Sequence, residues 1–155
     1  MKKTMVKFIA VLAIVIGGVV SSNAQELGVR FGDISGGNVA IDGIFSTGQF
    51  SRIHGDVSFG NGFGVDLLWD FFYRPLSGEA FNWYMGVGPY LGVFDIGNDD
   101  DEFNLGAAFE IGLEYHFNSI PIALGVDYRP ALEIIEDTDF HAGDFGFNIR
   151  YVFGQ

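Results

Sequence analysis

The stretch just before the last two residues constrains the fold more than any other part of the chain. Over residues 144–153 one face carries Phe145, Phe147, Ile149, Tyr151 and Phe153. The opposite face carries Asp144, Gly146, Asn148, Arg150 and Val152. This period of two predicts a β-strand with one aromatic, apolar face and one largely polar face. Such a face can lie in the core of a soluble protein or against lipid, and the period alone does not choose between them.

The N-terminus is typical of an export signal. A lysine-rich start precedes an apolar run over residues 8–20, and small residues follow up to Ala24. We therefore predict a cleaved signal peptide over residues 1–24 and one domain over residues 25–155. A retained membrane helix is the alternative, but the apolar run is shorter than the ~20 residues that span a bilayer. The chain has no cysteine, which excludes disulfides, thiolate metal sites and a cysteine-linked lipid anchor.

The charge of the remaining chain is strongly negative. Once residues 1–24 are removed, the chain has five arginines and 20 acidic residues, which gives a formal net charge of −15. A nucleic-acid partner is not expected, because nucleic-acid binding depends on neutralising phosphates with Lys and Arg. After residue 24 the sequence offers no apolar segment long enough for a spanning helix, so insertion into a membrane would have to use strands.

Eight strand-like segments separated by turn residues can be drawn along the mature chain. They cover residues 26–33, 38–45, 50–59, 63–74, 81–94, 104–117, 121–132 and 140–153. We predict an all-β fold, an eight-stranded antiparallel transmembrane β-barrel with up-and-down connections. Pro89 and Pro130 fall inside these segments and are expected at bulges or strand ends, because proline cannot donate a ladder hydrogen bond.

Two further patterns favour lipid on the apolar side. All five arginines of the mature chain fall on the polar face of a predicted strand. Aromatic residues recur on the apolar face near strand ends, as expected for the interfacial girdle of a membrane barrel. These aromatic residues are Phe63, Tyr73, Phe81, Tyr115, Phe117, Tyr128, Tyr151 and Phe153. A soluble barrel with a ligand inside is the remaining structural alternative.

Three segments carry a family resemblance. Residues 84–92 (Tyr-Met-Gly-Val-Gly-Pro-Tyr-Leu-Gly), 112–117 (Gly-Leu-Glu-Tyr-His-Phe) and 126–130 (Val-Asp-Tyr-Arg-Pro) resemble small porin-like outer-membrane β-barrel proteins. The broad relatives are eight-stranded barrels of the OmpA and OmpX kind. The resemblance implies Sec-dependent export to the outer membrane of a Gram-negative envelope. It also implies contact with outer-membrane lipid and lipopolysaccharide, escort by periplasmic chaperones, and recognition of the C-terminal strand by the barrel-assembly machinery.

The polar faces predict a charged interior. The charged residues expected to face inward are Arg30, Asp42, Arg52, Asp56, Asp66, Asp70, Arg74, Glu110, Glu114, Asp127, Arg129, Asp144 and Arg150, together with His54. An eight-stranded barrel is wide enough only for its own side chains, so we expect a structural network of ion pairs. The alternative is a narrow polar path, which would favour cations because acidic residues outnumber arginines.

Outside this predicted network, few residues are candidates for metal binding or catalysis. His54, His116 and His141 are dispersed and lack metal-ligand spacing, so we predict no metal site and no cofactor. Asp99, Asp100, Asp101 and Glu102 form an acidic loop that is expected outside the barrel, without the ordered spacing of a calcium loop. We expect a non-enzymatic envelope protein with a structural or surface-interaction role. The alternatives are a narrow channel and a lipid-modifying enzyme, although no nucleophile–base–orienter set is visible.

Overall fold

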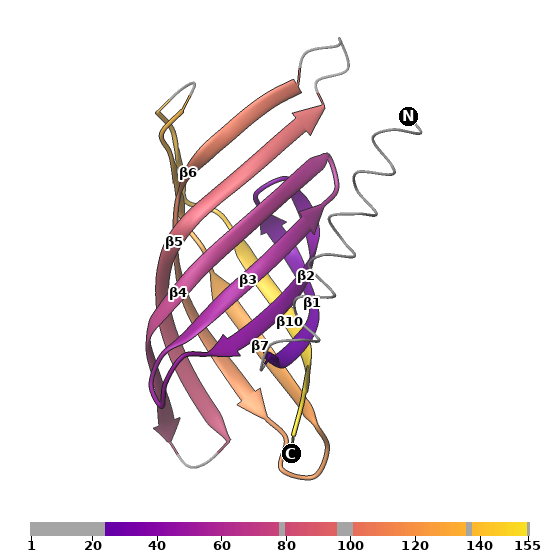
Figure 1. Ribbon diagram of the computed structural model, residues 1–155, viewed down its shortest axis with the longest axis vertical. Coiled ribbons are helices and arrows are strands. Elements are labelled where there is room, and N and C mark those ends of the chain that lie inside the picture. The colour runs from indigo at the N-terminus through magenta and orange to yellow at the C-terminus, as the bar shows by residue number, and fades with distance from the viewer. Residues whose placement is uncertain (1–23, 78–79, 96–100, 136–137, 155) are drawn as a thin grey trace.

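The chain folds into a barrel whose strands run obliquely around a common axis (Figure 1). The computed structural model describes residues 24–77, 80–95, 101–135 and 138–154. Residues 1–23, which include all but the last residue of the predicted signal peptide, lie outside the described part. None of the described residues belongs to a helix that is long and apolar enough to cross a membrane.

Neighbouring strands are antiparallel and the sheet closes on itself. The strands are β1 (Ala24–Ile34), β2 (Gly37–Ser46), β3 (Arg52–Phe59), β4 (Gly62–Ser77), β5 (Phe81–Asp95), β6 (Asp101–His116), β7 (Ile122–Tyr128), β8 (Ala131–Glu133), β9 (Phe140–His141) and β10 (Phe145–Val152). Pairing runs from β5 through β4, β3, β2, β1, β10 and β7 to β6, and β5 also pairs with β6. The prediction of an all-β, closed, eight-stranded antiparallel barrel is therefore confirmed.

Ten strand segments make eight wall strands because two wall strands are interrupted. β7 and β8 both pair with β6 in one unbroken register, with Tyr128 opposite Ile111 and Ala131 opposite Ala108. Pro130 lies in the gap between them, as expected for a residue without an N–H, and its carbonyl still accepts from the N–H of Phe109 at 2.9 Å. β9 and β10 form the eighth wall strand, with a register offset of one residue between them.

The expectation of a bulge at Pro89 is wrong. Pro89 lies within β5 directly opposite Ala107, and the register with β6 continues unchanged on both sides. The missing N–H of Pro89 instead affects the pairing of β5 with its other neighbour, β4. β4 pairs with β5 at Asp66 and again at Trp69, and the unpaired stretch between these residues lies opposite Pro89. The sheet therefore accommodates this proline by skipping ladder contacts rather than by adding a residue.

A bulge does occur in β4, between Trp69 and Phe72. An extra residue in a strand inverts the faces of everything beyond it, because side chains alternate with a period of two. Tyr73 consequently turns inward and lies opposite Tyr84, while Arg74 turns outward and lies opposite Trp83. Uninterrupted alternation predicts Tyr73 outside and Arg74 inside, and the structure corrects both positions.

The barrel has charged side chains inside and large apolar side chains outside. Leu67 and Trp69 are each 53% exposed, whereas Arg30 and Asp42 are fully buried. Globular proteins in water show the opposite arrangement, with Asp, Glu, Lys and Arg almost never fully buried unless they are paired. The interior also holds one small apolar cluster, formed by the buried residues Leu68, Tyr90, Ala108 and Ala131.

Glycines make room for two of the large aromatic residues of the interior, Tyr84 and Tyr90. A Cβ added at Gly112 would overlap the ring of Tyr84, and one added at Gly106 would overlap the ring of Tyr90. Both tyrosines are buried. The space beside the inward glycines is therefore filled by neighbouring side chains at these two positions.

One group of outer aromatic residues lies near the end of the barrel where β1 begins and β10 ends, which we call the terminal end. The ring of Tyr115 lies 4.7 Å from that of Phe81 and 4.9 Å from that of Phe117, measured between centroids. Tyr151 and Phe153 form another pair at 5.0 Å. The opposite end, which we call the distal end, has the connections after β1, β3, β5 and β8.

Candidate functional site

The first candidate site is a network of ion pairs inside the barrel, and Arg150 anchors it near the terminal end. The guanidinium of Arg150 lies 2.7 Å from Glu26, 3.1 Å from Asp42 and 2.6 Å from Glu114. Arg52 binds Glu114 at 2.9 Å and Asp70 at 2.6 Å. These side chains come from β1, β2, β3, β4, β6 and β10, so the contacts cross-link the barrel from within.

His54 lies at the centre of the network, on β3. Its Nε2 is 2.8 Å from Asp42 Oδ1, and its Nδ1 is 3.0 Å from Glu110 Oε1. Both ring nitrogens face carboxylate oxygens, and this arrangement suits a doubly protonated imidazolium that donates to both. His54 therefore acts as a bridge between the walls formed by β2 and β6.

Arg129 and Arg30 extend the network toward the distal end. Arg129 binds Asp56 at 2.6 Å and Glu110 at 3.0 Å. Arg30 binds Asp127 at 2.6 Å, and the amide of Asn148 donates to the same carboxylate at 2.9 Å. All of these side chains are almost completely buried. Low dielectric around them makes each contact strong and each missing partner costly.

The structure brings together most of the residues that the sequence placed inside. Those buried in the interior are Arg30, Asp42, Arg52, Asp56, Asp66, Asp70, Glu110, Glu114, Asp127, Arg129 and Arg150. Arg74 is not among them, because its guanidinium lies 3.5 Å from the ring centroid of Phe50 on the outer side. Asp144 is half-buried at the distal end. Asp99 and Asp100 of the acidic loop lie outside the described residues, as do the side chains of Asp101 and Glu102.

Sequence reasoning left four interior residues out of the predicted network. Glu26 and Asn148 could have been found by extending the alternation, since each lies two or four residues from an inward arginine on the same strand. Glu133 is buried because β8 continues one residue beyond the predicted end of the seventh segment. Tyr73 was missed because only the bulge in β4 turns it inward, where its ring lies 4.5 Å from the guanidinium of Arg52.

Acidic side chains outnumber cations in the described interior. Nine carboxylate residues are buried against four arginines and His54. Within the described part of the chain, Asp56 Oδ1, Asp66 Oδ2 and Asp70 Oδ1 have no hydrogen-bond partner. A buried charge without a partner is unfavourable, so this excess makes the interior more receptive to cations than to anions.

Three groups of side chains have the composition of a metal site. They are Glu26 with Glu114 and His116, Asp42 with His54 and Asp56, and His54 with Asp70 and Glu110. In each group the candidate ligand atoms lie within 4.8 Å of one another. The same carboxylates already bind arginines, and a metal would need an imidazole nitrogen that has lost its proton. The geometry as it stands is that of ion pairs.

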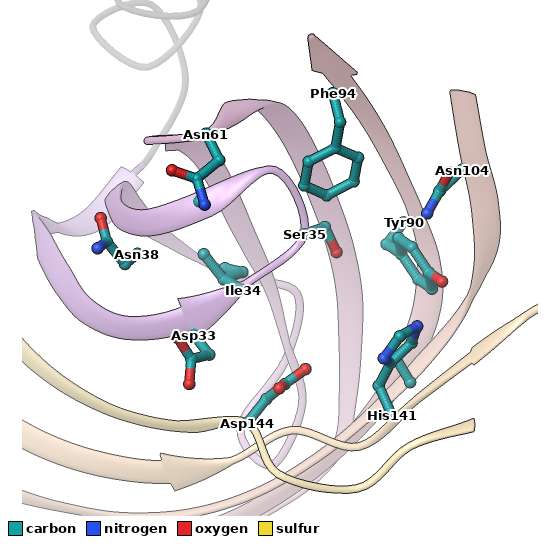
Figure 2. Close-up of a pocket in the computed structure, with 12 residues that line it drawn as sticks. Asp33, Ile34, Ser35, Asn38, Asn61, Tyr90, Phe94, Asn104, His141 and Asp144 are labelled. Carbon is teal, nitrogen blue, oxygen red and sulfur yellow. The ribbon is translucent and has the colours of Figure 1, made fainter. Parts of the chain in front are cut away.

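The second candidate site is a cavity of about 260 Å³ at the distal end. Figure 2 shows Tyr90, Asn104 and His141 on one side of this distal cavity and Asp33 and Ile34 on the other. Ser35, which also lines the cavity, donates from its hydroxyl to Asp66 Oδ1 at 3.1 Å. The Asn104 amide donates to Glu133 Oε2 at 3.1 Å.

Among the carboxyl groups that line the distal cavity, Asp144 has the pKa that its environment shifts most clearly. Partial burial raises the pKa of Asp144, His141 opposes this increase, and the nearby Asp33 adds to it. The carboxyl therefore takes up a proton at a higher pH than an ordinary aspartate does.

A smaller cavity of about 190 Å³ lies at the terminal end, lined by Glu26, Arg52 and Tyr73 among others. Between the two cavities the interior holds Arg30, Arg129, Arg150 and Tyr84, which are among the largest fully buried side chains of the protein. The chemistry of the barrel is therefore that of a cross-linked, filled interior with a small recess at each end.

Comparisons of the chain with protein-family models, with curated proteins and with solved structures gave no match. The function of the protein is therefore inferred from the geometry of the barrel and from the sequence.

Proposed function

We propose that this chain is an integral outer-membrane β-barrel protein of a Gram-negative envelope. Its role is structural or involves surface interactions, it is not an enzyme, and its interior is a filled barrier. The observation that carries this proposal is the reversed polarity of the barrel, with ion pairs inside and large apolar side chains outside. Lipid accounts for both halves of this pattern, since strands of membrane barrels place apolar residues outward and polar residues inward.

The outer surface supports contact with hydrocarbon. Large apolar side chains are exposed on every wall strand except β3, including Leu67, Phe109, Val126 and Ile149. Soluble monomers rarely expose contiguous apolar patches larger than a few hundred Å². Wall strands such as β5 with 15 residues and β6 with 16 exceed the ~9–11 residues that a tilted transmembrane strand needs.

The sequence supports the route to that membrane. The predicted signal peptide directs Sec-dependent export, and the resemblance to small porin-like barrels of the OmpA and OmpX kind gives the outer membrane as the destination. β10 has the alternating aromatic pattern that the barrel-assembly machinery would recognise, after escort by periplasmic chaperones. The partners in the membrane would be outer-membrane lipid and lipopolysaccharide.

A filled interior favours the structural role over the channel. A channel would need a continuous aqueous path, whereas Arg129, Arg150 and Tyr84 occupy the space between the two end cavities. All three histidines have carboxylates rather than serines as their polar contacts within the described residues, which favours a structural role for them.

Site-specific labels can test the lipid-facing surface directly. The chain has no cysteine, so a single introduced cysteine carries one nitroxide. Leu113 is 41% exposed on the outer wall, and Gln49 is exposed in the turn after β2. In liposomes, a label at Leu113 should collide with oxygen more than with a water-soluble nickel complex, and a label at Gln49 should show the reverse. Water exposure at Leu113 in the folded barrel would refute membrane insertion. Heat-modifiable migration on gels confirms folding of both variants.

A further inference from the structure

The distal cavity has the dimensions of a site for a small molecule. Its volume of about 260 Å³ corresponds to roughly nine water molecules at ~30 Å³ each. Pockets for drug-sized ligands begin at about 300 Å³, so an occupant of this cavity would have about ten non-hydrogen atoms or fewer.

The charge around the cavity is negative and largely uncompensated. Asp33 and Asp144 line it, and within the described residues no hydrogen-bond donor reaches either carboxylate. Arg30 is nearby, but its guanidinium binds Asp127 and the main-chain oxygen of Asp33. The remaining cationic candidate is His141, whose Nε2 lies 3.6 Å from Glu133.

A buried carboxylate just below the cavity adds to this field. Asp66 is 1% exposed and accepts a hydrogen bond from Ser35, which lines the cavity. Its second oxygen, Oδ2, has no hydrogen-bond partner among the described residues. Asp66 also lies directly opposite Tyr90, another lining residue, in the β4–β5 ladder. A positively charged occupant of the cavity would stabilise the ionised form of this carboxyl group.

Two aromatic rings complete the lining. Tyr90 and Phe94 both come from inward positions of β5 and both line the cavity. The faces of such rings attract cations, among them ammonium groups carried by ligands. A site that combines carboxylates with aromatic faces therefore selects positive charge carried on carbon-bound nitrogen.

The arrangement of ligands argues against a metal ion at this position. Groups of three carboxylate or imidazole ligands close enough to hold one ion occur in the described structure at Glu26, at Asp42 and around His54, and none of them includes a residue that lines the distal cavity. The carboxylates of the distal cavity do not form such a group. We propose that the distal cavity binds a small organic cation, an alkylammonium of the diamine class, between Asp33, Asp144 and the rings of Tyr90 and Phe94.

This inference goes beyond the proposed membrane role and does not depend on it, because the cavity would be present whether the barrel faced lipid or water. Its test uses the mature chain folded in detergent and titrated by calorimetry with three probes. The probes are putrescine, the uncharged diol of the same chain length (1,4-butanediol), and calcium chloride.

The expected result is saturable binding of one putrescine and no binding of the diol. Asp33→Asn and Asp144→Asn should each weaken putrescine binding about fivefold, the effect of losing one partly exposed ion pair of about 1 kcal/mol. Asp139→Asn is the matched control, since it removes the same charge from an exposed residue near the distal end that does not line the cavity. This control should bind as tightly as the wild type.

A second variant tests the location without altering charge. Asn61 is exposed in the turn between β3 and β4 and lines the cavity, so Asn61→Trp should fill it and abolish binding while the fold is kept. Three outcomes would overturn the inference. They are equal binding of putrescine to Asn61→Trp, equal weakening by Asp139→Asn and Asp144→Asn, and displacement of putrescine by calcium at equal concentration.

Discussion

Replacing Arg150 with methionine should be one of the most destabilising single changes in this barrel. Arg150 is 1% exposed, and its guanidinium contacts three carboxylates, from Glu26, Asp42 and Glu114. Methionine keeps much of the side-chain volume but removes the charge and all the donors. Asp42 keeps His54 and Glu114 keeps Arg52, whereas Glu26 keeps only His116 at 3.5 Å among the described residues.

The magnitude follows from the number of carboxylates left without their partner. Removing one member of a buried ion pair typically costs about 3–5 kcal/mol. Because three carboxylates lose a contact and one is left almost alone, the upper half of this range, about 4–5 kcal/mol, is expected. Arg74 supplies the matched control. Its guanidinium lies on the outer side over Phe50, where a cation–π contact contributes about 0.5–1 kcal/mol.

The two substitutions, Arg150→Met and Arg74→Met, can be compared by urea unfolding of the folded barrel in detergent, followed by tryptophan fluorescence. With a denaturant slope of about 2 kcal/mol per molar, the midpoint should fall by about 2 M for Arg150→Met and by less than about 0.5 M for Arg74→Met. Adding Glu26→Gln to Arg150→Met should restore part of the loss, because it removes the most isolated carboxylate. Equal shifts for the two arginines would refute the placement of Arg150 inside and Arg74 outside.

Three further predictions test other parts of the structure. Planar-bilayer recording of the wild type should show no discrete openings, and Arg129→Ser, which removes a fully buried side chain from the interior, should raise the conductance for small cations. Gly112→Val should displace Tyr84 and destabilise the barrel by about 2 kcal/mol through overpacking, whereas Gly143→Ala, with no atom within 4 Å of the added Cβ, should leave stability unchanged in the same urea assay. Putrescine affinity should fall as the pH is lowered, because burial raises the pKa of Asp144 and its protonation removes the negative charge. Calorimetry of Asp144→Asn should show a flatter pH dependence.

The wall strands could be predicted from the sequence because a strand reveals its two faces locally. β6 is the clearest example, since Phe109, Ile111 and Leu113 alternate with Glu110 and Glu114 without any break. An alternating face needs no information about the rest of the chain to be assigned to one side of the sheet. For this reason alternation groups the charges of the regular strands on one face, and the aromatic and arginine patterns then favour that face as the inner one.

Arg74 shows where the same reasoning fails. A bulge inverts every later residue of a strand, and alternation counted from Phe63 carries the error forward to Tyr73 and Arg74. The sequence did contain a sign of this bulge, because Phe72 is an apolar residue on the face expected to be polar. The bulge places Phe72 outward, with its ring centroid 4.5 Å from that of Trp83. The other exception, Leu68, is truly inside, in the cluster with Tyr90.

The partners within the interior could not be predicted. Arg30 contacts Asp127, which is 97 residues away, and Arg52 contacts Glu114 at a separation of 62. Which residues meet across the lumen depends on the tilt and stagger of the strands, and these are properties of the closed barrel rather than of any one strand. The distal cavity was missed for the same reason, since its lining combines single residues from many strands and turns.

The reversed polarity supports lipid because its two halves, buried charges and exposed apolar side chains, occur together. Neither half alone would support lipid. Buried ion pairs occur in soluble proteins when both partners are satisfied, and exposed apolar residues are common when they are scattered. Here both features extend along the same strands, so that Leu113 and Glu114 are neighbours with 41% and 1% exposure. A soluble barrel would gain stability by exchanging the two faces, since water would then solvate the charges and the apolar side chains would fill the core. The opposite order along the wall strands supports the proposal that hydrocarbon surrounds this barrel.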